Sequence, residues 1–169
     1  MAKRQKSRTK TDKNRKPYSR ASDDEKVARN WRKALGLYER REYSVAVLRC
    51  ATCLELAVNF AIRQELVSEL KLPMQFVDKL LLNANGIHGK YQNLYLPIMA
   101  QYEDQDDLKR LWRDRIMKIN SERNKVAHRG EFRSRKAAKN VMADTYEALK
   151  EIMNPYGFGG GLMPFSAKI

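Results

Sequence analysis

Apolar residues recur every three or four positions along most of the chain, and few stretches alternate between apolar and polar residues. This spacing is typical of amphipathic α-helices rather than of strands. A first helix should begin at Ser22, because Ser22-Asp23-Asp24-Glu25 has the form of a capping box, and should end near Arg40. Its expected inward residues are Val27 or Ala28, Trp31, Ala34 or Leu35, and Tyr38.

The pattern then predicts a long second helix from about Glu42 to Leu70, which stops before Pro73. Its middle is apolar nearly all round, and this is typical of a buried central helix. Five polar residues nevertheless share about a third of its circumference. They are Arg49, Thr52, Glu55, Asn59 and Arg63. Such a stripe either faces a polar cleft or pairs with neighbouring helices, and for Glu55 we favour a bond to a structural Arg over a catalytic role.

A third helix is expected to start at Pro73 and to end before Gly86, which would be its C-cap. Its predicted inward residues are Phe76, Val77, Leu80 and Leu81. Residues 86–103 have an irregular pattern that Pro97 breaks, so at most one or two helical turns are expected there. His88 in this stretch would be an ordinary solvated loop histidine.

Two further helices complete the predicted fold. The acids of residues 104–107 favour a helix start, and the inward residues that follow are Leu108, Leu111, Trp112, Ile116 and Ile119. A last helix should span about Ser134 to Met153 and end at Asn154-Pro155. The sequence thus predicts an all-α, up-and-down bundle of about five helices over residues 22–153, between a flexible basic arm (1–21) and a flexible Gly-rich tail (154–169).

Charge is concentrated at the amino terminus. The chain has a formal charge of +14, and residues 1–20 hold nine Lys or Arg against the single acid Asp12. Such an arm favours RNA through phosphate neutralisation and counterion release, although a solubilising or antitoxin-docking tail is an alternative. Because Tyr18 is its only ring, base stacking by the arm is not expected. The predicted RNA-binding residues are Lys3, Arg4, Lys6, Arg8, Lys10, Lys13, Arg15 and Lys16.

Several other classes are disfavoured. The basic start is followed by polar residues rather than by the apolar run of a signal peptide, and the stretch Val45 to Ile62 is too interrupted for a membrane span, so we expect a cytoplasmic protein. Cys50 and Cys53 form an isolated C-x-x-C, and the two histidines are far away in sequence. Buried core thiols are therefore favoured over a zinc or redox site, and neither a metal nor a cofactor is expected.

The segment Arg123-Asn124-Lys125-Val126-Ala127-His128 places a permanent cation, a carboxamide and an imidazole close together near the end of the fourth helix. These groups suit the handling of a phosphodiester. The segment resembles the motif of the HEPN family, in which an Arg and a His are separated by four to six residues. The first of the intervening residues is commonly polar, as Asn124 is here. The entry Tyr38–Ala46 into the long helix, and Glu55 on that helix, are similar as well. The resemblance covers roughly residues 30–153.

The resemblance implies a metal-independent endoribonuclease, of the toxin or phage-defence kind, whose site forms across a homodimer interface. On a helix, Asn124 and His128 share a face, whereas Arg123 projects about 140° away, so one copy is not expected to aim all three at one phosphate. A two-fold interface would bring two segments together. One His128 would act as base and its mate as acid, both Arg123 would bind the phosphate, and Asn124 would orient the site, with Arg129 and Arg133 adding positive potential.

Alternatives remain open at this stage. In a purely structural role, Arg123 would pair with Glu122 or Glu131, and His128 would bond carbonyls of the last helical turn. The chain could also be a non-catalytic RNA-binding HEPN protein that uses the segment as an interface. A third possibility is a nucleotide-binding subunit that partners a nucleotidyltransferase, although the long basic arm disfavours it.

Overall fold

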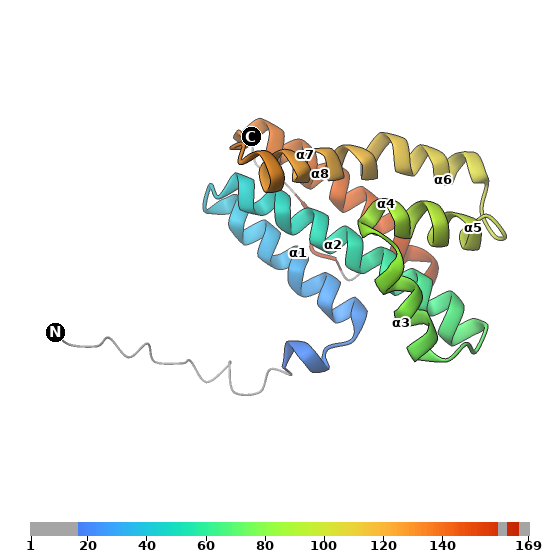
Figure 1. Ribbon diagram of the computed structural model, residues 1–169. Helices are drawn as coiled ribbons and strands as arrows, with labels where there is room; N and C mark the ends of the chain where they lie inside the picture. Colours follow the sequence, from blue (N-terminus) through green and yellow to red (C-terminus); the bar gives the residue numbers. More distant parts are fainter. Residues whose placement is uncertain (1–16, 159–161, 166–169) are drawn as a thin grey trace.

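The structure, a computed structural model, describes residues 17–158 and 162–165. These residues contain no strand and form six helical rods (Figure 1). The rods comprise α1 (Asp23–Glu39), α2 (Tyr43–Arg63) with η3 (Gln64–Glu69), α3 (Met74–Asn83), α4 (Gly86–Lys90) with η4 (Tyr91–Tyr95) and α5 (Leu96–Met99), α6 (Gln105–Leu111) with η5 (Trp112–Ile116) and α7 (Met117–Arg129), and α8 (Arg135–Met153). The predicted all-α class is confirmed.

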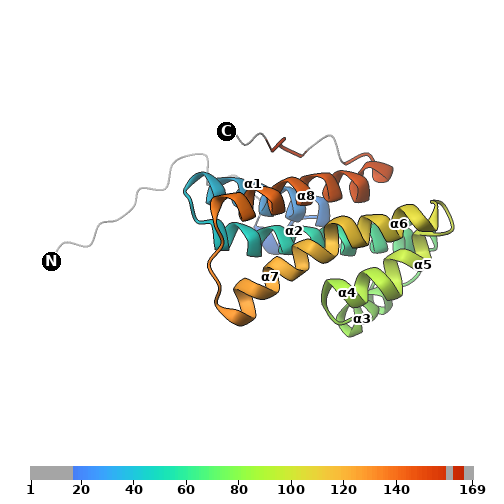
Figure 2. The same ribbon diagram turned by 90° about the horizontal axis from the view of Figure 1, so that it is seen from above.

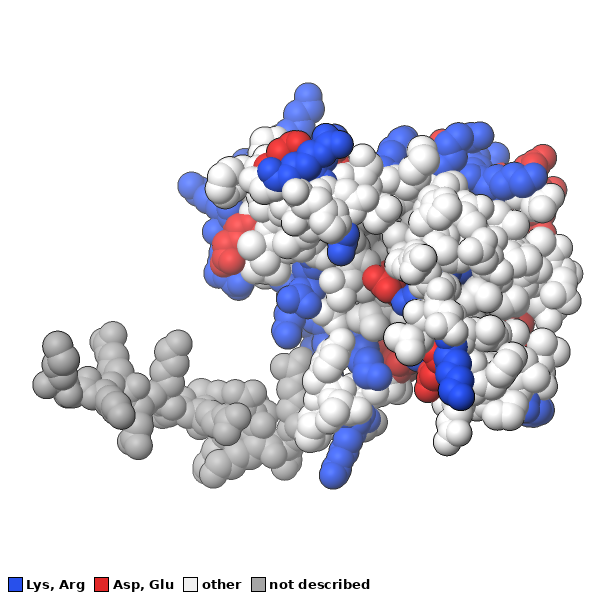
Figure 3. Space-filling view, viewed as in Figure 1, with Lys and Arg blue, Asp and Glu red and all other residues white. Residues whose placement is uncertain are grey.

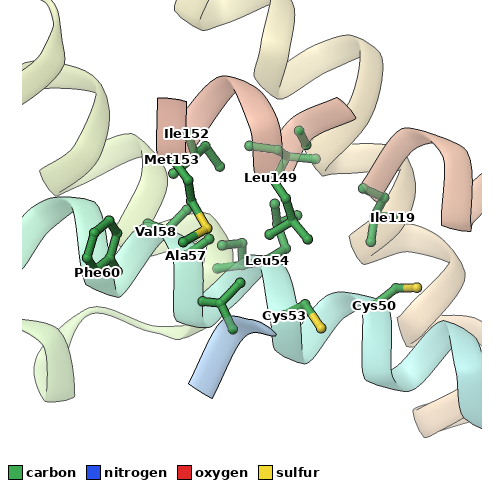
Figure 4. Packing of buried hydrophobic residues seen from close by; sticks show 14 of the residues in the cluster. Cys50, Cys53, Leu54, Ala57, Val58, Phe60, Ile119, Leu149, Ile152 and Met153 are labelled. Atoms are coloured by element: carbon green, nitrogen blue, oxygen red, sulfur yellow. The ribbon is translucent and has the colours of Figure 1, made fainter. Parts of the chain in front are cut away.

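Helix α2 is the centre of the bundle and packs against α1, α7 and α8 (Figures 1 and 2). Figure 4 shows side chains of α2, among them Leu54 and Val58, beside Leu149 and Ile152 of α8. Each of these aliphatic side chains is at most 1% exposed. Burying one such side chain contributes about 1.5–3 kcal/mol, so the apolar middle of α2 contributes substantially to the stability of the core.

By length and composition alone, the stretch Tyr43–Glu69 is able to cross a membrane. In the structure, however, 56% of its most apolar window is buried against the rest of the chain. A core helix that is apolar nearly all round gives the same composition. The position of α2 between three other helices therefore accounts for its hydropathy.

The polar stripe of α2 pairs mainly with neighbouring helices. Arg49 Nη1 donates to Asn30 Oδ1 at 2.9 Å, and Arg63 bonds both Asp23 (2.7 Å) and Asp78 (2.8 Å). Thr52 Oγ1 donates to the carbonyl oxygen of Leu48 within the helix. The stripe thus joins α2 to α1 and α3. Of the two roles predicted for it, pairing with neighbouring helices is the one seen here, rather than facing a polar cleft.

The predicted starts of the first and last helices are confirmed. Ser22 N donates to Glu25 Oε2 at 2.9 Å in a capping box, and α1 ends at Glu39. At the other end of the chain, Ser134 Oγ accepts from Ala137 N and starts α8. The start of the fourth predicted helix is also confirmed, because Asp104 Oδ1 accepts from the backbone N–H of Asp106.

Residues 86–99, expected to be irregular, are helical. Ile87, Tyr91, Tyr95 and Met99 lie four positions apart and are all buried, so this segment contributes a complete face to the core. Pro97 is accommodated in the first turn of α5, directly after the π-helical stretch η4, where its missing N–H costs little. The prediction of an irregular segment was wrong because it gave the two glycines and the proline more weight than the four-residue spacing of these apolar side chains.

Details of α3 also differ from expectation. Val77 and Leu81 are buried and Leu80 packs against the core, but Phe76 is 51% exposed. Gly86 is not the C-cap of this helix; Ala84 is. Instead, Gly86 opens α4 with a φ of 56°, a left-handed conformation that glycine adopts at low cost.

Within the described residues, segments on both sides of the predicted helical domain (22–153) also pack against the bundle. Tyr18–Arg20 form a 3₁₀ turn, and Tyr18 Oη accepts from Asn30 Nδ2 at 2.9 Å. From the predicted tail, Leu162 is buried, and the carbonyl oxygen of Met163 accepts from Trp31 Nε1 at 2.7 Å. Helix α1 is therefore packed against segments from both ends of the chain.

Candidate functional site

The predicted functional segment lies on the last two turns of α7. Figure 2 shows this end of α7 projecting from the bundle beside the α1–α2 turn and the start of α8. The helix ends at Gly130, which has a φ of 66° and donates its N–H to the carbonyl of Lys125. Glycine at this position is the usual way to end a helix in the left-handed conformation.

The three predicted site residues meet within one chain. Arg123 Nη1 lies 2.9 Å from Asn124 Oδ1 and 2.9 Å from His128 Nε2. The helix is continuous through all three, so the predicted divergence of about 140° applies to the direction of the Cβ atoms only. The three groups nevertheless touch one another within one copy, because the long Arg123 side chain bridges the angle.

This geometry defines the state of the imidazole. A guanidinium has only N–H donors, so His128 Nε2 must accept, and the ring proton then resides on Nδ1. The Nε2 lone pair of His128 is therefore covered by Arg123. A protonated ring would present a second donor to Nη1 and would break the contact.

Arg123 is an uncompensated cation. Between residues 17 and 158, and in 162–165, no carboxylate forms an ion pair with it. Glu122 instead bonds Lys125 (2.6 Å) and Arg133 (2.8 Å), and Glu131 bonds Arg133. The purely structural pairing of Arg123 with Glu122 or Glu131 is therefore wrong for this structure.

A network around Arg133 supports the segment from behind. The backbone N–H of Arg133 donates to Ser44 Oγ at 2.9 Å, which ties the loop after α7 to the first turn of α2. Partial burial alone would raise the pKa of Glu122, but the hydrogen bonds from Lys125 and Arg133 outweigh it and hold that pKa below 4.5. Arg133 had been expected only to add positive potential, and Ser44 and Glu122 carried no sequence signal for this role.

The remaining predicted residues lie apart from the three. Glu55 accepts from Lys90 Nζ at 2.6 Å, so its structural partner is a lysine of α4 and not an arginine. Arg129 is exposed and lies 3.9 Å from Glu131. His88 is exposed against the Trp112 ring at 5.2 Å, on α4 rather than in a loop. The eight predicted RNA-binding residues of the arm, which lie between positions 3 and 16, are outside the described residues.

The two cysteines are fully buried in the core, as expected (Figure 4). Burial raises the pKa of the Cys50 thiol to about 12 and also raises that of Cys53. Both thiols therefore stay protonated at neutral pH. In the described part of the chain, no group of three His, Cys, Asp or Glu side chains is arranged to hold a metal ion.

The surface around the segment is basic and carries one isolated ring. Figure 3 shows Lys and Arg side chains gathered along the end of the molecule that holds the α1–α2 turn, with few acids among them. Phe132, in the loop after α7, is 93% exposed. This exposed ring lies four residues after His128.

Comparisons with known proteins give no assignment: no family model matches the chain, and neither a curated protein nor a solved structure is significantly similar to it.

Proposed function

We propose that this protein is a metal-independent endoribonuclease of HEPN type that cleaves RNA by attack of the 2′-hydroxyl. One observation carries the proposal: a guanidinium without a carboxylate partner is hydrogen-bonded to an imidazole and a carboxamide on an exposed helix end. These groups are the cation, base and orienting dipole that phosphodiester cleavage requires. The resemblance of the segment to the HEPN motif points to the same chemistry.

Substrate binding would uncover the base. A phosphodiester is an anion and accepts charge-assisted hydrogen bonds that are roughly twice as strong as those to a neutral acceptor. Arg123 therefore exchanges His128 Nε2 for phosphate oxygens when RNA binds. Nε2 is then free to take the 2′-hydroxyl proton, and Asn124 Oδ1, already bonded to Nη1, keeps the guanidinium in place.

The reaction also needs an acid for the leaving 5′-oxygen. Attack of the 2′-oxygen on phosphorus forms one P–O bond, and the bond to the 5′-oxygen breaks as that oxygen gains a proton. The only other histidine of the chain, His88, packs against Trp112 on α4. A second His128, in its protonated form, is supplied by another copy of the chain in a two-fold dimer. The products carry a 2′,3′-cyclic phosphate and a 5′-hydroxyl.

The non-catalytic alternative is favoured by one feature of the same geometry. In the absence of RNA, His128 Nε2 is occupied, so the segment would serve only as a phosphate-binding surface if Arg123 kept that contact in the complex. RNA would then bind through Arg123 and the basic arm without being cut. A cleavage assay distinguishes the two functions.

The test is to incubate the purified protein with RNA in EDTA and to analyse the ends of any products. Wild-type protein should release fragments with cyclic phosphate ends and leave DNA of the same sequence intact, because DNA lacks the internal nucleophile. His128→Ala and Arg123→Ala should each reduce the rate by at least a hundredfold. RNA bound but uncut by the wild type would establish the binding function instead.

Two matched controls exclude general effects of the substitutions. His88→Ala removes the other histidine, which is also exposed and helical. Arg113→Ala removes the positive charge of an exposed arginine on η5 that is paired with Asp114. Both variants should cleave at the wild-type rate. Equal cleavage by all five proteins would reject the proposed site.

A further inference from the structure

A cavity of about 1060 Å³ opens between the α1–α2 turn, the start of α8 and the segment Met163–Phe165. It lies at the same end of the bundle as the α7 segment (Figures 1 and 2). Its lining combines three arginines with three aromatic rings, namely Arg32, Arg41, Arg135, Tyr38, Tyr43 and Phe165. Nothing in the cleavage chemistry proposed above uses this cavity.

Arg41 adopts a backbone conformation that disfavours arginine. Its φ is 64°, in the left-handed region, and its N–H bonds the carbonyl of Tyr38 at 3.0 Å. Glu42 N bonds the carbonyl of Leu37, which completes the usual glycine-type ending of a helix. A side chain is strained at this position, and such strain is characteristic of functional sites.

The cavity has an excess of positive charge. In the described part of the chain, neither Arg32 nor Arg41 forms an ion pair with a carboxylate, and Glu39 is the only acid in the lining. An anionic ligand would compensate these charges. The hydroxyl of Tyr38 is buried and has no hydrogen-bond partner, which is costly unless a ligand supplies one.

The aromatic rings form a packed wall. Tyr38 contacts Tyr43 and Phe165, with ring centroids 5.5 Å apart in both pairs. Phe165 also contacts Trp31, whose Nε1 bonds the carbonyl of Met163 and fixes this segment against α1. A wall of rings beside guanidinium groups offers stacking to a base and charge-assisted hydrogen bonds to a phosphate.

We propose that this cavity binds a nucleoside phosphate, with the phosphate on Arg32 and Arg41 and the base against the rings. The nucleotide is either free or part of an RNA strand. The cavity adjoins the loop after α7, because the lining residue Tyr43 is next to Ser44, which accepts the hydrogen bond from the backbone N–H of Arg133. The proposal does not depend on cleavage, since the cavity and the α7 segment share no lining residue.

The test is titration of the full-length protein with 5′-AMP by calorimetry. Wild-type protein should show saturable binding, whereas adenosine without phosphate should bind at least tenfold more weakly. Arg41→Gly removes the guanidinium and relieves the backbone strain, so its affinity for AMP should fall at least tenfold while its melting temperature stays equal or rises. Tyr38→Phe should weaken binding severalfold, and Glu39→Gln should strengthen it.

The controls separate this proposal from the cleavage proposal and identify the source of the ligand. Arg113→Ala and His128→Ala should bind AMP as the wild type does. A short RNA that displaces AMP, and whose own affinity falls in Arg41→Gly, identifies a strand as the ligand; AMP that RNA does not displace identifies a free nucleotide. Unchanged AMP affinity in Arg41→Gly, or no saturable binding of either ligand, would overturn the proposal.

Discussion

Arg123 and His128 lie five positions apart on an unbroken helix, and their Nη1 and Nε2 atoms are 2.9 Å from each other. The contact has two consequences for any chemistry at this end of α7. It places the ring proton on Nδ1, and it withholds Nε2 from acting as a base. A ligand that competes for the guanidinium therefore activates the histidine.

Removing the guanidinium should make His128 more reactive. In Arg123→Gln, Nε2 no longer has the guanidinium as its donor, so acylation of His128 by diethyl pyrocarbonate should be severalfold faster than in the wild type. His88, whose ring contacts Trp112, is the internal reference and should react at the same rate in both proteins. Peptide mapping by mass spectrometry gives both rates. Equal acylation of His128 in the two proteins would contradict the observed contact.

The Glu122 carboxylate should contribute to stability in a pH-dependent manner. Its pKa is below 4.5 in the folded protein, so its contribution is fully present above pH 4.5 and is lost as the pH falls through the folded value. Glu122→Gln should lower the free energy of unfolding by about 1–2 kcal/mol at pH 7, because Lys125 and Arg133 lose a charged acceptor. Urea denaturation at pH 7 and pH 3.5 measures the difference.

Glu147→Gln is the matched control for this experiment. Glu147 pairs with Lys150 at the same i,i+3 spacing, but both side chains are more exposed than Glu122. Its removal should change stability by less than about 0.5 kcal/mol at either pH. A stability difference between Glu122→Gln and wild type that persists undiminished at pH 3.5 would show that the carboxylate charge is not responsible.

The sequence was sufficient for the elements whose signals are local. The capping box at Ser22 and the start of the last helix at about Ser134 are defined by nearby residues, and the structure confirms both. Residues 86–99 were mispredicted because glycine and proline were taken as breakers. The spacing of Ile87, Tyr91 and Tyr95 was the stronger signal there, since burial of these side chains offsets the cost of a glycine in a helix.

At the candidate site, too, the local sequence pattern pointed to the residues but did not predict their contacts in space. Arg123, Asn124 and His128 were chosen as candidates because their order and spacing resemble the HEPN motif. Their mutual contact did not, because a helical wheel gives the direction of Cβ and not the reach of a long side chain. The tie between Arg133 and Ser44 joins residues 89 positions apart, and no local pattern predicts such a pair.

The buried thiols should be unreactive in the folded protein and should make it sensitive to alkali. The pKa of Cys50 rises from 9.0 to about 12 on folding, so its contribution to stability is complete below pH 9.0 and is lost as the pH rises toward 12. Burial raises the pKa of Cys53 and Tyr91 in the same direction. The free energy of unfolding should therefore fall steadily above pH 9.

Two measurements check this prediction. Folded protein at pH 8 should react with a thiol reagent at least a hundredfold more slowly than protein unfolded in guanidinium chloride. Urea denaturation at pH 8 and pH 10.5 should give a lower midpoint at the higher pH. Rapid modification of both thiols at pH 8 without loss of helical signal would show that the core around α2 opens readily.

Deleting residues 1–16 should weaken RNA binding mainly at low salt. This segment holds eight Lys or Arg. Each phosphate contact with a single strand contributes about 0.7 to the slope of log affinity against log salt, so the slope should fall by up to about six if all eight bind RNA. Fluorescence anisotropy of a labelled RNA between about 50 and 300 mM salt measures the slope. An unchanged slope would exclude the arm from RNA contact and leave affinity to the folded domain.

The exposed Phe132 ring tests the dimer on which the cleavage mechanism depends. Phe132→Asp places a charge on a loop whose backbone is fixed by the bond from Arg133 N to Ser44 Oγ, so the fold should be retained. If the two copies meet at this end of α7, a buried carboxylate without a partner would destabilise the dimer strongly. Sedimentation equilibrium should then show the variant shifting to monomer, and cleavage should be lost in parallel.

Leu82→Asp is the control for this prediction, because Leu82 is also largely exposed (83%) but belongs to α3. It should leave both dimerisation and cleavage unchanged. Mixing inactive Arg123→Ala with inactive His128→Ala should not restore activity, since a mixed dimer contains a single His128 and the mechanism needs two, one as base and one as acid. Cleavage by a monomeric Phe132→Asp at the wild-type rate would exclude a second His128 as the acid and would require the proton donor to come from the same chain.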